Sequence, residues 1–512
     1  MTYPLYVALV WHMHQPYYKD SQSGEYLLPW VRLHAVKDYL HMAEVLAAHP
    51  GVHVTFNLVP SLVEQLLEYA SGQAQDRFQT LGLQESWTAE EKAFLLANCF
   101  SINWDNIIRR YPRYWQLLQL RQQAPNEALL FTDEYFRDLV AWFNLAWIDP
   151  NRLEQDPLLR QLVEKGVGFS IDDVRSILGK HREIMGQILP LYRHLEAAGQ
   201  LELIVSPYYH PILPLVMDNR YARRASPGLP LPDVLFAHPE DASEQIRLAV
   251  GAHRCHLGRQ PRGLWPSEGA VCPEIVFRLA QEGFTWFGSD EAVLALSVGQ
   301  WVQRDGYGHV TNPHLLYQPY RTHVGEHPPA VVFRDRLLSD RIGFVYKHWN
   351  GVDAAGDLVH RLHRIRENLN DPTRPYLVTI ILDGENCWEE YEHNGDVFLH
   401  HLYRLLHEDP NLKAVTVSEY LAEHPPRAEI TNLANIFRAK VVDVAPDSII
   451  LEITGTEEKI ESLVELLRPM GIIEMVRTGQ VAMLRGDSIG IRYTPGANGN
   501  TNGHSHFPEY EI

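Results

Sequence analysis

Short apolar segments, each ending in polar residues, recur along most of this chain and are separated by longer helix-like stretches. They lie at 5–11, 52–56, 201–205, 263–265, 285–287 and 376–382. Near-continuous apolar strands that alternate with helices indicate a parallel sheet covered on both faces. Barrels built in this way carry their functional residues at the carboxyl ends of the strands. The sequence therefore predicts an α/β barrel, with a site among the polar residues that follow the strands.

The stretch between the second and third apolar segments, about 60 to 200, has a mostly helical pattern. Two of its helix starts have the spacing of a capping box, Thr88 with Glu91 and Ser170 with Asp173. Because the stretch is too long for a single crossover between neighbouring strands, we interpret it as a helical insertion that walls one side of a cleft. A separate helical domain with no part in the site is the alternative.

The barrel is expected to occupy residues 1–425, because the composition and the spacing of apolar segments change after about residue 425. After the proline-bearing HPPR, segments follow in the order β-β-α-β, at 439–444, 449–453, 457–467 and 481–484. This order is typical of a small α+β domain of ferredoxin-like type, which we place at 427–486. The tail, 487–512, is rich in Gly and Asn and is expected to be disordered.

The charge of the chain narrows the classes of partner. Its 512 residues include 45 lysines and arginines against 64 aspartates and glutamates, a formal net charge of −19. Such a surface repels nucleic acid and anionic membranes, so a neutral substrate fits better. No apolar stretch reaches the roughly 18 residues needed to cross a bilayer, and the amino terminus lacks the features of a signal peptide. We therefore expect a soluble, cytoplasmic protein.

Two carboxylates follow strand-like segments and have a tryptophan close by. Glu268 lies in LWPSEGAV, three residues after Trp265, with little cationic compensation nearby. Asp383 ends YLVTIIL, the most apolar segment of the chain, and Trp388 follows it closely. An uncompensated carboxylate can act as a nucleophile, and burial at a strand end favours the protonated form that a general acid needs. Helix caps and ion pairs also use such carboxylates, so the pair is a stronger indication than either residue alone.

These two residue types are the ones that cleavage of a glycosidic bond with retention requires. One carboxylate attacks the anomeric carbon and the other protonates the leaving oxygen, with the two groups about 5 Å apart. Glu268 and Asp383 are 115 residues apart in the chain (383 minus 268). Only the fold can bring them together.

The histidines support a competing interpretation, a metal-dependent hydrolase such as a sugar deacetylase. His12 and His14 in WHMHQP share one face of a strand, because residues two apart point the same way. Further possible ligands are His253, His256, His323 and His327. No compact aspartate and HxxxH set accompanies them, and 26 histidines make chance clusters common. His14 and Gln15 can hydrogen-bond to sugar hydroxyls without a cation, so we expect no metal and no other cofactor.

At these residues the sequence resembles glycoside hydrolase family 57. Four segments carry the likeness: HMHQPYY at 12–18, ELIVSPYYHPILPL at 202–215, GLWPSEGAV at 263–271 and ILDGENCWEEY at 381–391. PWVRLHAVKDY, FNLVPSL and FRDRLLSDRIGF are also similar to the amylopullulanase-like branch, so the resemblance covers about residues 1–428. It implies a distorted (β/α)7 barrel that cleaves or transfers α-glucans without a metal cofactor.

The resemblance also implies roles for individual residues. Glu268 is similar to the family's nucleophile and Asp383 to its general acid/base. Contacts with substrate are implied for His14, His210, Trp265 and Trp388. Members of this branch usually continue into a helical segment with a fifth region that completes the cleft, and that region is not found in this sequence.

Residues 427–486 resemble a different family, the carboxyl-terminal domain of the acetolactate synthase small subunit. No segment of this sequence resembles the valine-binding ACT domain of such a subunit, so feedback regulation is not implied. Small α+β modules commonly pair through their sheet edges. We expect this region to support a homo-oligomer.

Three functions compete at this point. The leading hypothesis is a retaining α-glucan hydrolase of the α-amylase or amylopullulanase kind, acting on starch-like or glycogen-like glucan. A 4-α-glucanotransferase or branching enzyme is the nearest alternative, because hydrolysis and transfer share every catalytic residue. A non-catalytic glucan-binding or regulatory protein is the alternative of another class.

Overall fold

A computed structural model describes residues 2–124, 128–322, 327–369, 371–425, 440–445, 448–467, 472 and 474–477 of the chain. The chain divides into two compact units, Met1–Leu451 and Glu452–Ile512. Within these described ranges no helix combines the length and the apolar character that crossing a membrane requires.

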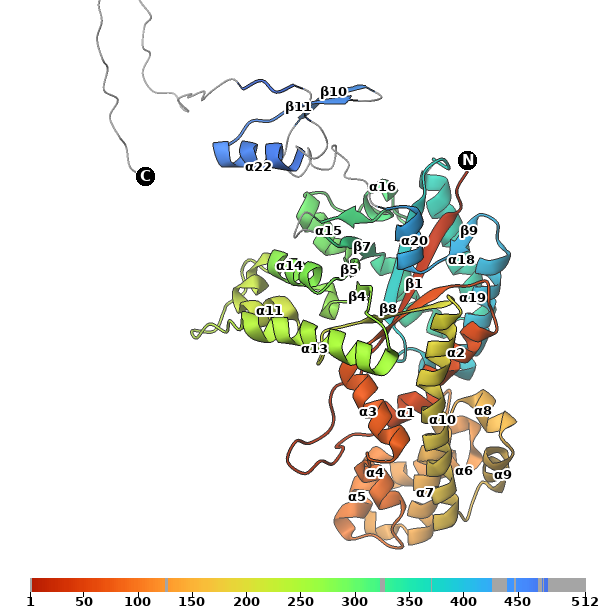
Figure 1. Cartoon of the computed structure of the whole chain (residues 1–512). Helices are drawn as coiled ribbons and strands as arrows, with labels where there is room; N and C mark the ends of the chain where they lie inside the picture. Colours follow the sequence, from red (N-terminus) through yellow and green to blue (C-terminus); the bar gives the residue numbers. More distant parts are fainter. Residues whose placement is uncertain are drawn as a thin grey trace, which may run out of the picture. The chain divides into compact units, whose positions relative to one another are not determined.

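Seven parallel strands close into a barrel in the first unit (Figure 1). They are β1 (Leu5–Met13), β2 (Val54–Leu58), β3 (Leu201–Val205), β4 (Gly263–Leu264), β5 (Trp286–Asp290), β7 (Ala330–Arg334) and β8 (Tyr376–Asp383). Each strand pairs with the next in this order, and β8 pairs with β1 to complete the ring. The predicted (β/α)7 barrel is therefore confirmed, and β7 is the one strand that the sequence pattern did not predict.

Two short strands extend the barrel at its edges. β9 (Leu412–Ala414) runs parallel to the first residues of β1, so β1 pairs with β9 at its start and with β2 at its end. β6 (Tyr320–Arg321) lies antiparallel to β7. This shared pairing of β1 is where the ring departs from a regular barrel.

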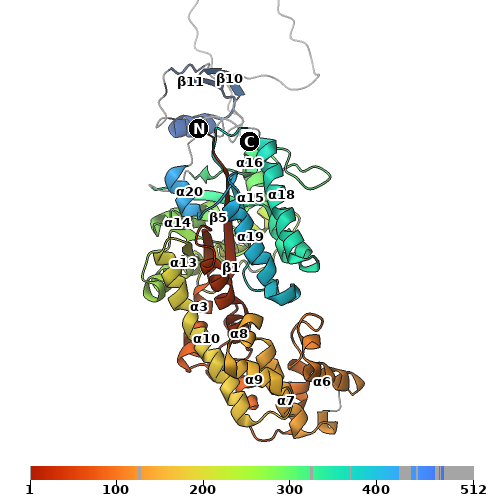
Figure 2. The same cartoon turned by 90° about the vertical axis from the view of Figure 1, so that its right-hand side faces the viewer.

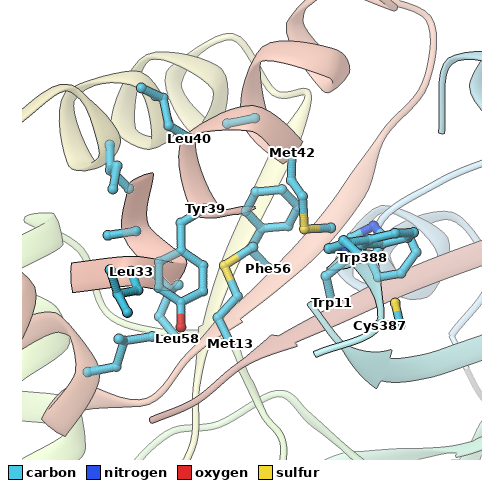
Figure 3. Close-up of a cluster of buried hydrophobic side chains, with 14 of the residues drawn as sticks. Trp11, Met13, Leu33, Tyr39, Leu40, Met42, Phe56, Leu58, Cys387 and Trp388 are labelled. Atoms are coloured by element: carbon cyan, nitrogen blue, oxygen red, sulfur yellow. The ribbon is translucent and has the colours of Figure 1, made fainter. Parts of the chain in front are cut away.

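Burial of both strand faces explains the near-continuous apolar segments. Along β1, the alternate residues Tyr6, Ala8 and Val10 join an interior cluster that also contains Trp265 and Trp286. The intervening residues belong to the larger outer core, which the helices cover. Figure 3 shows part of this outer layer, where strand and helix side chains meet. Because successive side chains of a strand point to opposite faces, a strand buried on both faces cannot alternate with polar residues.

Between β2 and β3 the described chain is helical. Its helices are α3 (Pro60–Ser71), α4 (Arg77–Gly82), α5 (Ala89–Asn98), α6 (Pro112–Gln123), α7 (Asp133–Ala146), α8 (Pro150–Gln155), α9 (Pro157–Lys165) and α10 (Ile171–Ala197). Figures 1 and 2 show α4 to α9 grouped at one end of the barrel, with α10 running back toward β3. The predicted capping boxes are confirmed, since Thr88 caps α5 with Glu91 and Ser170 caps α10 with Asp173.

The other helices cover the outside of the barrel. Those earlier in the chain are α1 (Trp30–His34), α2 (Leu40–Ala47), α11 (Leu213–Met217), α12 (Ala222–Ala225), α13 (Pro239–Leu257), α14 (Pro273–Gln281) and α15 (Glu291–Val298). Later in the chain come α16 (Pro313–Leu316), α17 (Arg336–Asp340), α18 (Gly351–Leu369), α19 (Asp396–Glu408) and α20 (Val417–Glu423). A π-helical turn, Ala35–Tyr39, joins α1 to α2 and carries Lys37, Asp38 and Tyr39 into the core. Such turns are frequent at functional sites.

The last described elements are β10 (Lys440–Ala445), β11 (Ser448–Glu452) and α22 (Glu457–Leu467). β10 and β11 pair with each other in a two-stranded sheet. Their order agrees with the β-β-α part of the predicted α+β domain. The fourth predicted segment, 481–484, and the tail, 487–512, lie outside the described residues.

Candidate active site

The carboxyl ends of β1, β2, β3, β4 and β8 meet at one mouth of the barrel. In the strand register His12 of β1 lies beside Asn57 of β2 on one side and beside Asp383 of β8 on the other. β3 and β4 pair next along the ring, and Glu268 follows β4. Residues distant in the sequence therefore converge on His12, at the place where parallel barrels carry their chemistry.

The two predicted catalytic carboxylates, Glu268 and Asp383, form what we call the carboxylate side. Both are exposed at this mouth, and Asp383 accepts a hydrogen bond of 2.8 Å from the Asn386 amide. Burial lowers the pKa of His12, while the negative charges of Asp383 and Glu268 both oppose that shift. Both carboxylates therefore act on the same imidazole ring.

One expectation about Asp383 is wrong. The sequence predicted burial at the end of this apolar strand, but β8 is buried only through Ile381, and Asp383 is exposed. β8 extends past the end of β7, which pairs with it only at Thr379, so the last residue of β8 lacks a neighbour on that side. The buried carboxyl group in this segment is instead that of Glu385, two residues later, which is 1% exposed.

Glu268 has an unusual backbone. Its φ is 57°, in the left-handed region, and it lies in a 3-10 turn, Ser267–Gly269. A non-glycine residue held there costs about 1–3 kcal/mol and is common at functional sites. Ser289 of β5 donates a hydrogen bond of 2.7 Å to the carbonyl of Gly269, the residue after Glu268. That buried hydroxyl ties the turn to the neighbouring strand.

Three histidines, His12, His14 and His210, form the neighbouring part of the mouth, which we call the histidine side. Their ring centroids are 5.7 Å apart for His12 and His14, 4.7 Å for His12 and His210, and 4.3 Å for His14 and His210. His210 also has a left-handed backbone, with φ of 57°. Two of the four described non-glycine residues with positive φ therefore lie at this mouth.

Burial keeps the histidine side neutral. It lowers the pKa of His14 to about 4, with a contribution from His12, and it lowers the pKa of His210 further. The three rings are therefore uncharged near pH 7. A neutral imidazole has one N–H donor and one lone pair, so each ring can hydrogen-bond to a hydroxyl group or ligate a metal ion.

A buried hydrogen-bond network holds His12 in place. His12 Nδ1 lies 2.5 Å from Asn57 Oδ1, and Ser206 donates a hydrogen bond of 2.9 Å to the same oxygen. The Ser206 hydroxyl also lies 2.7 Å from the carbonyl of Trp265. The strand ends of β1, β2, β3 and β4 are thus joined through side chains beneath the site. Asn57 directly ends a predicted strand, which is the signal by which it could have been found.

Glu385 supports the start of the loop after β1. Its Oε1 accepts hydrogen bonds from the main chain of His14 at 2.9 Å, from Tyr39 at 3.1 Å and from the Gln15 amide at 3.4 Å. Burial raises the pKa of Glu385 well above its usual value, and the charge of Asp383 raises it further. Both effects favour the protonated form of this carboxyl group. The predicted substrate residue Gln15 is buried and also accepts a hydrogen bond from Tyr18.

The two predicted tryptophans lie beneath the mouth. Trp265 is 5% exposed and belongs to the interior cluster of the barrel. Trp388 is fully buried against Trp11, as Figure 3 shows, and its indole donates a hydrogen bond of 2.8 Å to the carbonyl of Gly384. Trp388 therefore supports the chain next to Asp383, with neither indole face open to solvent.

Three tyrosines and a glutamate extend the histidine side outward and were not predicted. We call Tyr17, Tyr208, Tyr209 and Glu64 the tyrosine edge. Tyr208 and Tyr17 donate hydrogen bonds of 2.6 and 3.1 Å to the two oxygens of Glu64. Tyr209 packs edge-on against both rings and is 49% exposed. The run SPYYHP contains two of these rings directly before His210, and that adjacency is the signal in the sequence.

Only one described group of residues has the composition and spacing of a metal site, His12, His14 and His210. The other histidines considered as ligands lie elsewhere. Both ring nitrogens of His253 contact main-chain carbonyls, those of Arg259 and Leu203, so its role is structural. His323 lies outside the described residues, and His327 is exposed.

The carboxyl-terminal residues match a different family from the rest of the chain. The family model of the small subunit of acetolactate synthase matches residues 421–486. The probable acetolactate synthase small subunit of Archaeoglobus fulgidus is 54% identical over 65 residues, which is 12% of this chain and 41% of that protein. The chain thus spans about two fifths of the length of such relatives.

Solved structures similar to this chain include an alpha-amylase, AmyC, from Thermotoga maritima. It has 15% identity and a TM-score of 0.48, over 82% of this chain and 74% of that one. The family 57 branching enzyme of Pyrococcus horikoshii has 16% identity and a TM-score of 0.47, over 82% and 71%.

The family model of glycosyl hydrolase family 57 matches residues 8–432. That range contains the seven-stranded barrel except the first three residues of β1, the helices between β2 and β3, and every residue of the mouth described above. Because the match extends over most of the chain, the chain belongs to glycosyl hydrolase family 57.

Proposed function

We propose that this protein is a retaining glycoside hydrolase acting on α-glucan, with Glu268 as nucleophile and Asp383 as general acid/base. The observation that carries the proposal is the pair of exposed carboxylates that follow β4 and end β8 at one mouth of the barrel, with Asp383 beside His12 in the strand register. Membership of family 57 supports the glycosidic bond as the target. The segments similar to the amylopullulanase-like branch support α-glucan as the substrate.

The proposed reaction has two displacements at the anomeric carbon. A carboxylate oxygen of Glu268 attacks this carbon while the glycosidic C–O bond breaks, and Asp383 gives its proton to the departing oxygen. Asp383, now a carboxylate, then takes a proton from water, whose oxygen displaces Glu268. The product keeps the configuration of the substrate. Every proton in this cycle passes through Asp383, so the reaction needs no cofactor, and a chelator is expected to leave the rate unchanged.

The histidine side is proposed to hold the sugar that reacts. His14 and His210 are neutral and partly exposed, and a sugar hydroxyl group that reaches the enclosed Nε2 of His210 would give this atom the hydrogen bond that it lacks. Gln15, Trp265 and Trp388 are more deeply buried, which favours a supporting role under that sugar. Glu385 contributes by holding the main chain of His14.

A 4-α-glucanotransferase or branching enzyme remains the alternative within the same chemistry. In that case a sugar hydroxyl, in place of water, gives its proton to Asp383 and displaces Glu268. Product analysis on maltooligosaccharides separates the two, because hydrolysis releases reducing ends, whereas transfer lengthens or branches chains without releasing them.

Proton NMR of the first product tests the mechanism itself. Retention predicts that the α-anomer appears first and then mutarotates to the equilibrium mixture. A β-anomer as the first product would contradict the roles of Glu268 and Asp383. A protein that binds glycogen, releases no reducing ends and forms no new linkage would be the non-catalytic glucan-binding or regulatory alternative.

We also propose that residues 427–486 support self-association. β10 and β11 form a separate two-stranded sheet, and short sheets commonly pair through their edges. Truncation at about Pro426 keeps every residue of the mouth, so it is expected to leave the sugar chemistry unchanged and to make the protein more monomeric. Sedimentation of both chains alongside glucan assays tests this, and loss of activity on truncation would show that the module completes the cleft.

A further inference from the structure

The histidine side has a geometry that the glycosidase chemistry does not require. His12, His14 and His210 each offer one ring nitrogen, and these three atoms all lie within 4.8 Å of one another. Zn–N bonds of about 2.0–2.1 Å separate the nitrogens of a tetrahedral site by about 3.4 Å. Small rotations of the rings therefore complete a three-histidine set. We propose that His12, His14 and His210 bind one divalent transition-metal ion, and that an ion held there competes with the glucan.

The hydrogen bond of His12 prepares it as a ligand. Its Nδ1 lies 2.5 Å from Asn57 Oδ1, an acceptor, so Nδ1 carries the proton and donates it. The lone pair is then on Nε2, the other ring nitrogen. Histidines that bind metals commonly donate their second nitrogen in this way, which fixes both the tautomer and the orientation of the ring.

His210 supplies the second indication. Its Nε2 is fully enclosed, yet it has no hydrogen-bond partner among the described residues. A buried polar atom without a partner costs about 1–3 kcal/mol. The left-handed backbone of His210, with φ of 57°, holds this ring against the other two. A metal ion or a substrate hydroxyl at the centre of the trio would satisfy that nitrogen.

The charges around the trio favour a cation. Asp383 lies beside His12 in the strand register, and Glu268 follows β4 at the same mouth; both side chains are exposed. Imidazole ligands carry no negative charge, so these two carboxylates offset the charge of a divalent ion. Imidazole ligands suit Zn²⁺, Cu²⁺ and Ni²⁺ better than Mg²⁺ or Ca²⁺, which prefer oxygen.

An ion bound here occupies the ring nitrogens that the proposed function assigns to sugar hydroxyls. An ion added to the metal-free enzyme therefore acts as an inhibitor, and the glycosidase reaction proceeds without it. This competition rests on the proposed function. Binding of the ion does not, because it depends on the three histidines alone.

Another pair of histidines provides an internal control. His49 Nε2 lies 2.9 Å from His400 Nδ1 on the outside of the barrel, and Asp396 lies 3.6 Å from His400. This pair can hold a metal ion weakly and is not part of the mouth. The variant His400→Ala removes it and leaves the trio intact.

The test is calorimetric titration of Zn²⁺ into the untagged full-length protein after chelator treatment and desalting. Co²⁺ is titrated in parallel, because its visible absorption reports tetrahedral coordination by nitrogen. Wild type is expected to bind one ion per chain at the trio. His210→Asn, which suits a left-handed backbone, and His14→Ala are each expected to weaken binding by more than roughly 100-fold, beyond the roughly 10–100-fold range for supporting residues. His400→Ala is expected to keep the wild-type affinity.

Competition is measured in the same protein. Maltooligosaccharide is expected to raise the apparent dissociation constant of Zn²⁺, and Zn²⁺ is expected to raise KM with little change in kcat. Unchanged affinity in both His210→Asn and His14→Ala, or its loss in His400→Ala, would overturn the metal site. Since these titrations contain no glucan, that failure is distinct from failure of the proposed function. Zn²⁺ binding that glucan does not affect would overturn the competition.

Discussion

The two sides of the barrel mouth differ in how much protein surrounds them. Glu268 and Asp383, on the carboxylate side, are exposed, and Asp383 has one hydrogen bond from a side chain, that of Asn386. On the histidine side, His12 is buried, and the hydrogen-bond network of Asn57 and Ser206 holds it. An ionised carboxylate is far more costly to bury without a partner than a neutral imidazole is. Groups that form and break bonds thus remain accessible, while groups that hold the substrate are fixed by their surroundings.

The same contrast occurs within three residues of one segment. Asp383 is exposed at the end of β8, whereas Glu385, two residues later, is 1% exposed and accepts hydrogen bonds from His14 and Tyr39. Both side chains end in a carboxyl group, and only the surroundings of the two groups differ. Asp383 is thus available to a substrate, while Glu385 holds the loop that carries the histidine side.

The largest effect is expected from Glu268→Gln. The amide has the same shape but cannot form a glycosyl ester, so turnover should fall by more than about 10³-fold, as for other covalent nucleophiles. Rapid quench with a labelled activated glycoside measures turnover and trapping together, and binding of maltooligosaccharide should persist.

Glu274→Gln is the matched control, since Glu274 is exposed on α14 soon after the same turn. It is expected to keep wild-type turnover. A label trapped at position 268 of the Glu268→Gln variant, or a wild-type rate for that variant, would show that the carboxylate side does not supply the nucleophile.

Asp383→Asn should have the next largest effect, and one that depends on the leaving group. Loss of a general acid slows reactions by about 10²–10⁴-fold when the departing oxygen needs a proton. Natural glucans should therefore slow far more than aryl glycosides with an activated leaving group. Equal losses on both substrates would make Asp383 a structural carboxylate. Asp371→Asn, near the opposite end of β8, is expected to change neither rate.

Glu385→Gln tests the buried carboxyl group of Glu385 through the pH dependence of the free energy of unfolding. The raised pKa of Glu385 means that, above its usual value of 4.5, the folded protein still holds a proton that the unfolded chain has released. The free energy of unfolding therefore falls as pH rises toward the folded pKa, by about 1.4 kcal/mol per pH unit for this one group. The amide should remove this slope.

Denaturant unfolding from about pH 5 to pH 8 measures the slope for both proteins. Other buried groups, such as Glu202, contribute equally to wild type and variant, so the difference isolates Glu385. Glu244→Gln, on an exposed helix position, should keep the wild-type slope. Parallel curves for wild type and Glu385→Gln would show that Glu385 is ionised in the folded protein.

The carboxylate side was predictable from sequence, and the packing beneath it was not. Glu268 and Asp383 follow apolar strands directly, so local pattern and motif both indicated them. The burial of Trp388 depends on Trp11 and Tyr391, and its contact with Trp11 joins segments hundreds of residues apart. Periodicity within one segment carries no information about such partners.

Three other features of the structure were not predicted from the sequence. β7 was not predicted, although AVVFR is a short apolar run that prolines precede and polar residues follow, as at the other strand ends. Glu64 was not predicted because it lies inside α3 and gains its role only through Tyr17 and Tyr208. The left-handed backbone of His210 likewise follows from the tertiary structure, since histidine has no strong local preference for it.

The smallest effect is expected at the tyrosine edge, where the histidine side meets solvent. Tyr209 is 49% exposed and is held edge-on by Tyr17 and Tyr208, so one face of its ring is available to a sugar beyond the reacting one. An aromatic contact of this kind contributes about 0.5–1.5 kcal/mol, which corresponds to a roughly two- to tenfold change in affinity. Tyr209→Ala should raise KM for long maltooligosaccharides by that factor, with kcat nearly unchanged. Short aryl glycosides should be unaffected, because they do not reach the ring.

Two control variants accompany this prediction. Tyr209→Phe should behave as wild type, as should Tyr307→Ala, which removes an exposed tyrosine elsewhere. Equal changes in KM for short and long substrates would mean that Tyr209 acts by positioning His210, its neighbour in the chain, and the tyrosine edge would then belong to the reacting site itself.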